Sequence, residues 1–145
     1  MSNLRYSPAT PEDIDVIYNL CRELIETYED LSSIDLPAVL AWVRKKIQTQ
    51  ISGYTCVWQN DNKVAYFCLS EEPQGSELDD FYVLPEYRNR GIGSGVLKYC
   101  LEHAQKQMYL YVFTRNIGAI RLYERFGFVE TKQVSPTRII MTKLP

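Results

Sequence analysis

The segment Tyr82-Val-Leu-Pro-Glu-Tyr-Arg-Asn-Arg-Gly-Ile-Gly-Ser94 runs from an apolar strand into glycines that open a helix. Such a junction suits a phosphate, because the first N–H groups of a helix have no partner within it and the helix dipole favours an anion. Gly91 and Gly93 let the backbone approach that anion closely. Arg88 and Arg90 add two permanent positive charges. The sequence therefore predicts an anion-binding loop here.

Two common phosphate-binding motifs are absent from this loop. A dinucleotide fingerprint that begins at Gly91 needs glycine or alanine at position 96, where the chain has Val96. A P-loop needs Gly-Lys followed by Ser or Thr, which does not occur in the chain. The glycines alone therefore do not identify the anion.

A second block downstream supplies the missing information. The first block is Arg88-x-x-Gly91-x-Gly93. The second block lies further along the chain and reads Asn116-x-x-Ala119-x-x-Leu122-Tyr123-x-x-Phe126-Gly127-Phe128. Together the two blocks resemble the acyl-CoA-binding signature of the GNAT superfamily of N-acetyltransferases. The resemblance covers nearly the whole chain, and it implies acetyl-CoA as co-substrate and a primary amine as acceptor.

Size and composition indicate one domain. A chain of 145 residues, 46% of them hydrophobic, can bury one sizeable core and is too short for two, so we expect a single N-acetyltransferase domain over residues 1–145. No signal peptide or membrane-length apolar stretch is evident, which favours a cytoplasmic protein. The 4 cysteines form no CxxC pair and His103 is the only histidine, so we expect reduced, buried thiols and no metal site.

Charge is unevenly distributed along the chain. The formal net charge of −2 argues against a nucleic-acid partner. Residues 1–86 carry 6 Lys and Arg against 15 Asp and Glu, whereas residues 87–145 carry 10 against 3. The basic part contains both blocks, as an anionic cofactor would favour, and the acidic part suits a small cationic acceptor. Solvated charged surfaces without a partner are the alternative.

Hydrophobic periodicity predicts a mixed α/β fold. Helices are expected at 10–28, from Ser33 or Asp35 to 47, at 91–107 and at 118–125. Strands are expected at 4–7, 54–58, 64–70, 77–83, 108–113, 128–134 and 138–142. Three strands in succession imply an antiparallel meander, and the crossover through the third helix implies that its flanking strands are parallel. This order matches the GNAT fold, a central mixed sheet of about seven strands flanked by about four helices.

The resemblance implies a path for the cofactor. Its pantetheine arm is expected along the strand that ends Phe81-Tyr82-Val83, with the Val83 amide donating to the thioester carbonyl and to the oxyanion formed there. The pyrophosphate is expected beside Arg88, on the amides of Arg90, Gly91, Ile92, Gly93 and Ser94. Asn116 either caps the last helix or reaches the pantetheine amides, and both interpretations fit the sequence.

Tyr123 is the candidate general acid. A phenol with a pKa of about 10 is neutral at pH 7 and can protonate a leaving thiolate whose conjugate acid has a pKa of about 8.5. In the superfamily a tyrosine at this place often has that role. Packing of Tyr123 in a helix face against the sheet is the alternative.

The candidate bases lie on the strand before the loop. The stretch Leu78-Asp-Asp-Phe-Tyr-Val83 resembles the matching part of spermidine/spermine and related small-amine acetyltransferases, in which an acid at the place of Asp79 contacts the amine. Asp79 is ranked first, Glu77 second and a water-mediated route third. Strand alternation is expected to place Glu77, Asp79, Phe81 and Val83 on one face, and Leu78, Asp80 and Tyr82 on the other.

Three functional classes follow from the sequence. The first is an acetyltransferase that acts on a small cationic amine by direct attack in a ternary complex. The second is a non-catalytic acyl-CoA-binding or sensing module, and the third is a peptide or protein N-acetyltransferase. A homodimer is common in the superfamily, and nothing in the sequence specifies one.

Overall fold

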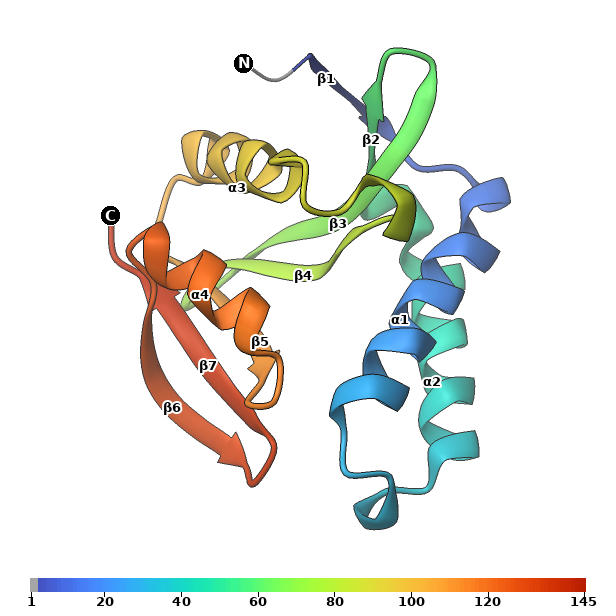
Figure 1. The fold of residues 1–145 in the computed structure, drawn as a ribbon, viewed down its shortest axis with the longest axis vertical. Helices are drawn as coiled ribbons and strands as arrows, with labels where there is room; N and C mark the ends of the chain where they lie inside the picture. The colour runs from blue at the N-terminus through green and yellow to red at the C-terminus, as the bar shows by residue number, and fades with distance from the viewer. Residues whose placement is uncertain (1–2) are drawn as a thin grey trace.

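A computed structural model gives the fold of residues 3–145, whose strands form one sheet in the order β1-β2-β3-β4-β5-β7-β6 (Figure 1). The strands are β1 Leu4–Pro8, β2 Tyr54–Gln59, β3 Asn62–Glu72, β4 Gly75–Val83, β5 Met108–Phe113, β6 Val129–Ser135 and β7 Arg138–Lys143. The helices are α1 Ile14–Tyr28, α2 Leu36–Gln50, α3 Ile92–His103 and α4 Ile117–Arg125, with short 3-10 turns at Pro11–Asp13, Leu31–Ser33, Ile51–Gly53 and Pro85–Tyr87. The α/β fold class, with its mixed seven-stranded sheet and these helices, is confirmed.

The helices divide between the two faces of the sheet, and each face has its own apolar core. On one face, α3 and α4 contribute Val96, Leu97 and Tyr123 to a cluster that includes Phe128. On the other face, α1 and α2 contribute Ile17 and Ile47 among others. No helix within residues 3–145 is both long and apolar enough to cross a bilayer.

The N-termini of α1 and α2 carry the caps that the sequence predicts. Thr10 N–H donates to the Asp13 carboxylate at 2.8 Å in a capping box at the 3-10 turn Pro11–Asp13, which leads directly into α1. Asp35, rather than Ser33, caps α2, since its carboxylate accepts from Ala38 N–H at 3.2 Å. The two helices therefore begin at defined positions.

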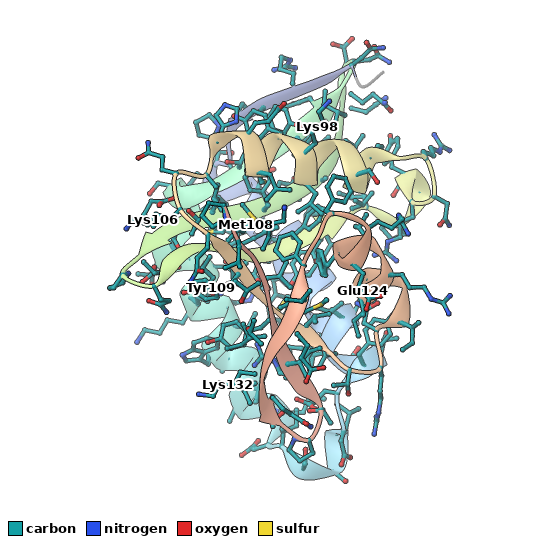
Figure 2. The ribbon with its side chains drawn as sticks, turned by 90° about the vertical axis from the view of Figure 1, so that its left-hand side faces the viewer. Lys98, Lys106, Met108, Tyr109, Glu124 and Lys132 are labelled. Atoms are coloured by element: carbon teal, nitrogen blue, oxygen red, sulfur yellow. The ribbon has the colours of Figure 1, made fainter. Side chains whose placement is uncertain are left out.

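The third helix is shorter than the sequence predicts, because α3 ends at His103 and not near 107. The carbonyl oxygen of Gln107 instead accepts from Ser76 N–H at 2.8 Å, which ties the end of the connection to the start of β4. Gly75 is required there, since a Cβ would lie 2.5 Å from that oxygen. Figure 2 shows Lys106, Met108 and Tyr109 where this connection enters β5.

β4 and β5 are parallel for only a short distance. Their pairs are Ser76 with Met108 and Glu77 with Tyr109, after which β4 continues to Val83 without a partner on that side. The antiparallel meander of β2, β3 and β4 and the parallel β4–β5 pair are both confirmed. The divergence of the two strands opens the sheet between the helix layers.

A β-bulge corrects the predicted alternation along β4. The register between β3 and β4 shifts between the pairs Tyr66–Tyr82 and Cys68–Asp79, and Asp80, which lies within the shifted part of β4, has a left-handed φ of 46°. Leu78 consequently belongs to the core under α3 and α4, whereas Tyr82 belongs to the core under α1 and α2. The expectation that these two side chains share a face is wrong, and Phe81 and Val83 likewise pack against the α3 side rather than beside Asp79.

Candidate active site

The divergence of β4 and β5 contains a cleft of about 660 Å³. Its walls come from α1 and α2 on one side and α4 on the other, and its residues include all three candidate catalytic side chains, Glu77, Asp79 and Tyr123. A second pocket of about 360 Å³ adjoins it and shares Phe81, Tyr82 and Asn116 with it. The structure therefore brings the predicted base and the predicted acid to one cavity.

The bulge turns both aspartates towards α2. Lys46 of α2 forms a salt bridge with Asp79 and a second one, at 3.3 Å, with Asp80. The hydroxyl groups of Tyr54 and Tyr82 also donate to Asp80, whose side chain is 9% exposed. The Asp79 side chain is 36% exposed and accepts from Asp80 N–H at 2.9 Å. Asp80 is thus a buried structural carboxylate, and Asp79 faces the cleft.

Both candidate bases have raised pKa values. Burial raises the pKa of Asp79, the charge of Asp80 adds to this effect, and the opposing influence of Lys46 does not cancel it. Burial likewise raises the pKa of Glu77, with a contribution from Asp79, although the Tyr109 hydroxyl donates to Glu77 at 3.2 Å. A carboxylate with a raised pKa is a better proton acceptor, which suits either group to a role as general base.

Tyr123 is fixed by the way α4 ends. Phe128 N–H donates to the Tyr123 carbonyl at 3.1 Å and Gly127 N–H to the Glu124 carbonyl at 3.0 Å, a Schellman motif that needs the left-handed φ of 92° at Gly127. The Tyr123 ring packs against Phe128 with 5.7 Å between centroids, and its side chain lines the cleft. The position of this tyrosine therefore rests on the block that the sequence analysis singled out.

The Tyr123 hydroxyl group makes no hydrogen bond to another group of residues 3–145. It is not fully buried, because no fully buried side-chain polar atom in this range lacks a partner, and the Tyr123 residue lines the cleft. Burial of the ring raises the pKa of Tyr123 well above its usual value. The phenol consequently stays protonated across the physiological range.

The open edge of β4 presents the Val83 peptide group. Leu84 N–H donates to the Val64 carbonyl of β3 at 2.9 Å, so alternation directs the Val83 N–H and C=O away from β3. The Val83 carbonyl indeed accepts from Arg88 Nε at 3.0 Å on that side. Since β5 has already diverged, the Val83 N–H is available to a ligand placed along this edge.

The glycine loop has the geometry of an anion cradle. Gly91 caps α3 with a left-handed φ of 80°, and Asn89 has a φ of 63°. No atom lies within 4 Å of a Cβ built on Gly91, so the space above the loop is open. The amides that follow Gly91 belong to the first helical turn and have no acceptor within the helix. A Cβ on Gly93 would make only ordinary contacts, with Leu122 at 3.6 Å and Phe81 at 3.8 Å.

The two arginines of the motif contact different groups. Arg88 lines the second pocket, where it also contacts Glu23 of α1 at 3.2 Å. Arg90 lies over the Tyr87 ring, 5.6 Å from its centroid. Asn116 caps α4, because its carbonyl oxygen accepts from Ala119 N–H at 3.2 Å, and it borders both cavities. The capping role is confirmed, and contact with a ligand stays a prediction.

Lys46 and the tyrosines that bind Asp80 were not predicted from the sequence as site residues. Lys46 lies on the same face of α2 as the buried Val43 and Ile47. A charged residue at this place in the helical repeat is the sequence signal that could have predicted its inward position. Trp42, one turn earlier, also lines the cleft and is 63% exposed. Tyr54 carried no sequence signal beyond its place at the start of a strand.

Comparison with known proteins identifies the class. Residues 12–128 match the model of the Acetyltransferase (GNAT) family, and the chain belongs to this family. The resemblance that the two sequence blocks carry is therefore confirmed.

Individual relatives match in different ways. The spermine/spermidine N(1)-acetyltransferase of Bacillus subtilis is 43% identical over 56 residues, which are 35% of this chain and 37% of that protein. N-alpha-acetyltransferase 60 of Xenopus tropicalis is 29% identical over 135 residues, or 81% of this chain and 56% of that protein. The chain thus spans about a third to a half of the length of these two relatives.

A solved structure supports the fold over its full length. The PaiA N-acetyltransferase of Thermoplasma acidophilum, in complex with coenzyme A, superposes with a TM-score of 0.74 at 20% identity and covers 100% of both chains.

Proposed function

We propose that this protein transfers the acetyl group of acetyl-CoA to a primary amine of a small cationic acceptor, by direct attack in a ternary complex. The observation that carries the proposal is the presence, in one cleft, of a partly exposed carboxylate at Asp79 and of Tyr123, whose phenol has no hydrogen-bond partner within residues 3–145. Amide formation from a thioester needs a proton acceptor for the amine and a proton donor for the leaving thiolate, and these two groups match the two needs.

The donor substrate fits the open edge of β4 and the loop that follows it. Val83 N–H is directed to this edge and would donate to the thioester carbonyl and to the oxyanion formed from it. The amides from Arg90 to Ser94 would hold the pyrophosphate at the N-terminus of α3, with Arg88 at the adjoining pocket. The openness of the space at Gly91 supports this placement.

The chemistry can then be written for this chain's own residues. Asp79, directly or through a water molecule, takes a proton from the acceptor ammonium, and the neutral amine attacks the thioester carbon. Val83 N–H stabilises the negative charge on the carbonyl oxygen. As the carbon–sulfur bond breaks, Tyr123 gives its proton to the thiolate. The second proton of the attacking nitrogen is lost through water and restores the Tyr123 phenol, Asp79 releases its proton to solvent, and CoA and the N-acetylated amine leave. Glu77, which has a raised pKa in the same cleft, is the second candidate for the base.

The charge of the cleft supports a cationic acceptor. Four acidic side chains line it against two basic ones: Glu29, Glu77, Asp79 and Asp80 against Lys46 and Arg138. An acidic cavity raises the local concentration of cations. The likeness of part of the chain to a Bacillus spermine/spermidine N(1)-acetyltransferase points in the same direction.

The proposal is tested by measuring CoA release from acetyl-CoA with a panel of acceptors at equal concentration. The panel contains diamines, spermidine, spermine, amino acids, aminoglycosides and short peptides. Diamines and polyamines are expected to give the highest kcat/KM. Acetyl-CoA binding without CoA release for any acceptor would contradict the proposal and would favour a sensing module.

A peptide acceptor is the second candidate. The likeness to N-alpha-acetyltransferase 60 of Xenopus tropicalis extends over most of this chain, which favours an N-terminal amine as substrate. In the same panel, a short peptide with a kcat/KM above that of every polyamine would select this function.

A further inference from the structure

Lys46 occupies the part of the cleft where an acceptor ammonium is expected. Its Nζ contacts the carboxylates of Asp79 and Asp80, and its side chain is 17% exposed. A lysine ammonium and a primary ammonium of a substrate have the same charge, the same three donors and nearly the same size. The contacts that Lys46 makes are therefore those that a cationic acceptor would need.

The fold does not depend on Lys46 to satisfy Asp80. The hydroxyl groups of Tyr54 and Tyr82 both donate to this carboxylate, so it keeps two partners when Lys46 leaves. Asp79 keeps the hydrogen bond from Asp80 N–H at 2.9 Å and is open to the cleft through its exposed side. Departure of Lys46 would thus leave one carboxylate, Asp79, ready to bind a different cation.

Lys46 can leave without movement of the backbone. It stands on α2 beside the exposed Lys45, and its four-carbon stem can turn towards solvent. Trp42, one helical turn away, has its ring centroid 5.8 Å from the Lys46 Nζ and is largely exposed. A cation that replaced Lys46 would meet the same two carboxylates and the same aromatic ring.

We propose that Lys46 is an internal competitor for the acceptor site: its ammonium group holds the place of the substrate's ammonium, and an acceptor binds by displacing it. This inference rests on the proposed function only in taking the cleft as the acceptor site. Lys46 is on this view a specificity-determining residue. Displacing Lys46 costs free energy, and an amine binds well only if it makes contacts that Lys46 does not make. This cost is the threshold for acceptor binding.

The threshold distinguishes acceptors with one charge from acceptors with two. A monoamine forms only the contacts with Asp79 and Asp80 that Lys46 loses, so the net free energy of its binding is close to zero. A diamine can place its second ammonium near Glu77 or Glu29, which line the same cleft and make no salt bridge to any residue of 3–145 within 4 Å. Lys46 should therefore weaken the binding of all amines by the same factor, so that diamines and polyamines, with their additional contacts, still bind measurably while monoamines bind poorly.

The test measures amine binding by isothermal titration calorimetry in the absence of acetyl-CoA. The probes are 1,4-diaminobutane and 1-aminobutane, and the proteins are the parent, Lys46→Met and Lys45→Met. Lys46→Met keeps the length and apolar stem of the side chain and removes its charge. It is expected to bind 1-aminobutane about tenfold or more tightly than the parent, as befits removal of a competing charge from a partly screened site. Lys45→Met, on the exposed neighbour, is expected to bind both probes as the parent does.

Unchanged or weaker binding of 1-aminobutane by Lys46→Met would overturn the proposal, because it would mean that Lys46 organises the site rather than competes for it. Lys46→Arg provides a second test that does not depend on folding of the methionine variant. Arginine keeps the cation and can engage the two carboxylates with a fork of donors, so this variant should bind both amines no more tightly than the parent. Tighter binding by Lys46→Arg would also refute the competitor role.

The calorimetric result is independent of turnover. If the parent protein acetylates no amine but Lys46→Met binds amines more tightly, the proposed function fails and the competitor role stands. If amines are acetylated and Lys46→Met shows no gain in affinity, the competitor role fails and the proposed function stands.

Discussion

Replacement of Tyr123 by phenylalanine removes a single hydroxyl group from the cleft. Because this hydroxyl makes no hydrogen bond within residues 3–145, its loss should change the free energy of unfolding by less than about 1 kcal/mol. The ring contact with Phe128 is kept. If the phenol protonates the leaving thiolate, kcat should fall by about 10²–10⁴-fold, which corresponds to about 3–5 kcal/mol of transition-state stabilisation. The dissociation constant of acetyl-CoA should stay within about threefold of the parent's, since little binding energy is removed.

The assay follows CoA release with a thiol reagent at saturating acetyl-CoA and amine, and calorimetry gives the acetyl-CoA affinity. Tyr99→Phe is the matched control, because Tyr99 lies on α3 between Tyr6 and His103, with ring centroids 3.7 and 4.0 Å away. It should keep the parent's kcat. A loss of kcat below about tenfold in Tyr123→Phe, or an equal loss of acetyl-CoA affinity, would refute the general-acid role.

Three further substitutions address the base, the anion loop and the fold. Asp79→Asn should lower kcat/KM for the amine by at least about tenfold at neutral and lower pH, and less at alkaline pH where the amine is already neutral; a pH profile identical in shape to the parent's would shift the role to Glu77 or to water. Gly91→Val forces a β-branched residue into a φ of 80° at the edge of the loop, so calorimetry should show acetyl-CoA binding weakened by about 100-fold in a folded protein, and retained affinity would contradict the anion cradle. Asp13→Asn should destabilise the fold by about 2–4 kcal/mol in urea unfolding, because Lys63 at 2.8 Å loses its buried partner. Burial alone would raise the pKa of Asp13, but bonds from Lys63, Thr10 and Tyr66 outweigh it and hold the pKa below its usual value. The stabilisation by Asp13 is therefore present above about pH 4 and is lost as the pH falls further. Asp13→Asn lacks this contribution, so its stability should fall less on acidification than the parent's. An equal fall in both proteins would refute the stabilising role of the Asp13 carboxylate.

Most of the fold could be predicted because its signals are local. Helix caps at Thr10 and Asp35, the stop at Gly127 and the apolar strands specify the elements and nearly all their ends. The parallel β4–β5 pair followed from the helical crossover that joins the two strands, because parallel neighbours need such a connection. The end of α3 could not be predicted, since it depends on the long-range bond between Gln107 and Ser76.

The bulge in β4 could have been predicted from its residue types, although not from the alternation of apolar and polar residues. Two adjacent aspartates are unusual in a strand, and aspartate is one of the few residues that adopt a left-handed φ readily, as Asp80 does here. The simple alternation rule failed because the bulge adds one residue to β4. As a result Asp79 and Asp80 both face α2, which brings the acidic pair to the cleft.

The relative positions of candidate site residues could be predicted only for residues that are close together in the sequence. Tyr123 and Asn116 belong to one short block, and their positions follow from the start and end of α4. The meeting of Lys46 with Asp79 joins residues 33 apart in sequence and depends on how α2 packs against the sheet. No local pattern encodes that contact.

Mass spectrometry of the amine, after incubation of the parent protein with acetyl-CoA and spermidine, tests the proposed acetyl transfer most directly. We expect N-acetylated spermidine to accumulate in step with CoA release in the parent and to be reduced at least about 100-fold in Tyr123→Phe, which should still bind acetyl-CoA. If the parent binds acetyl-CoA but forms no acetylated amine, or if Tyr123→Phe forms it at the parent's rate, the central claim is contradicted.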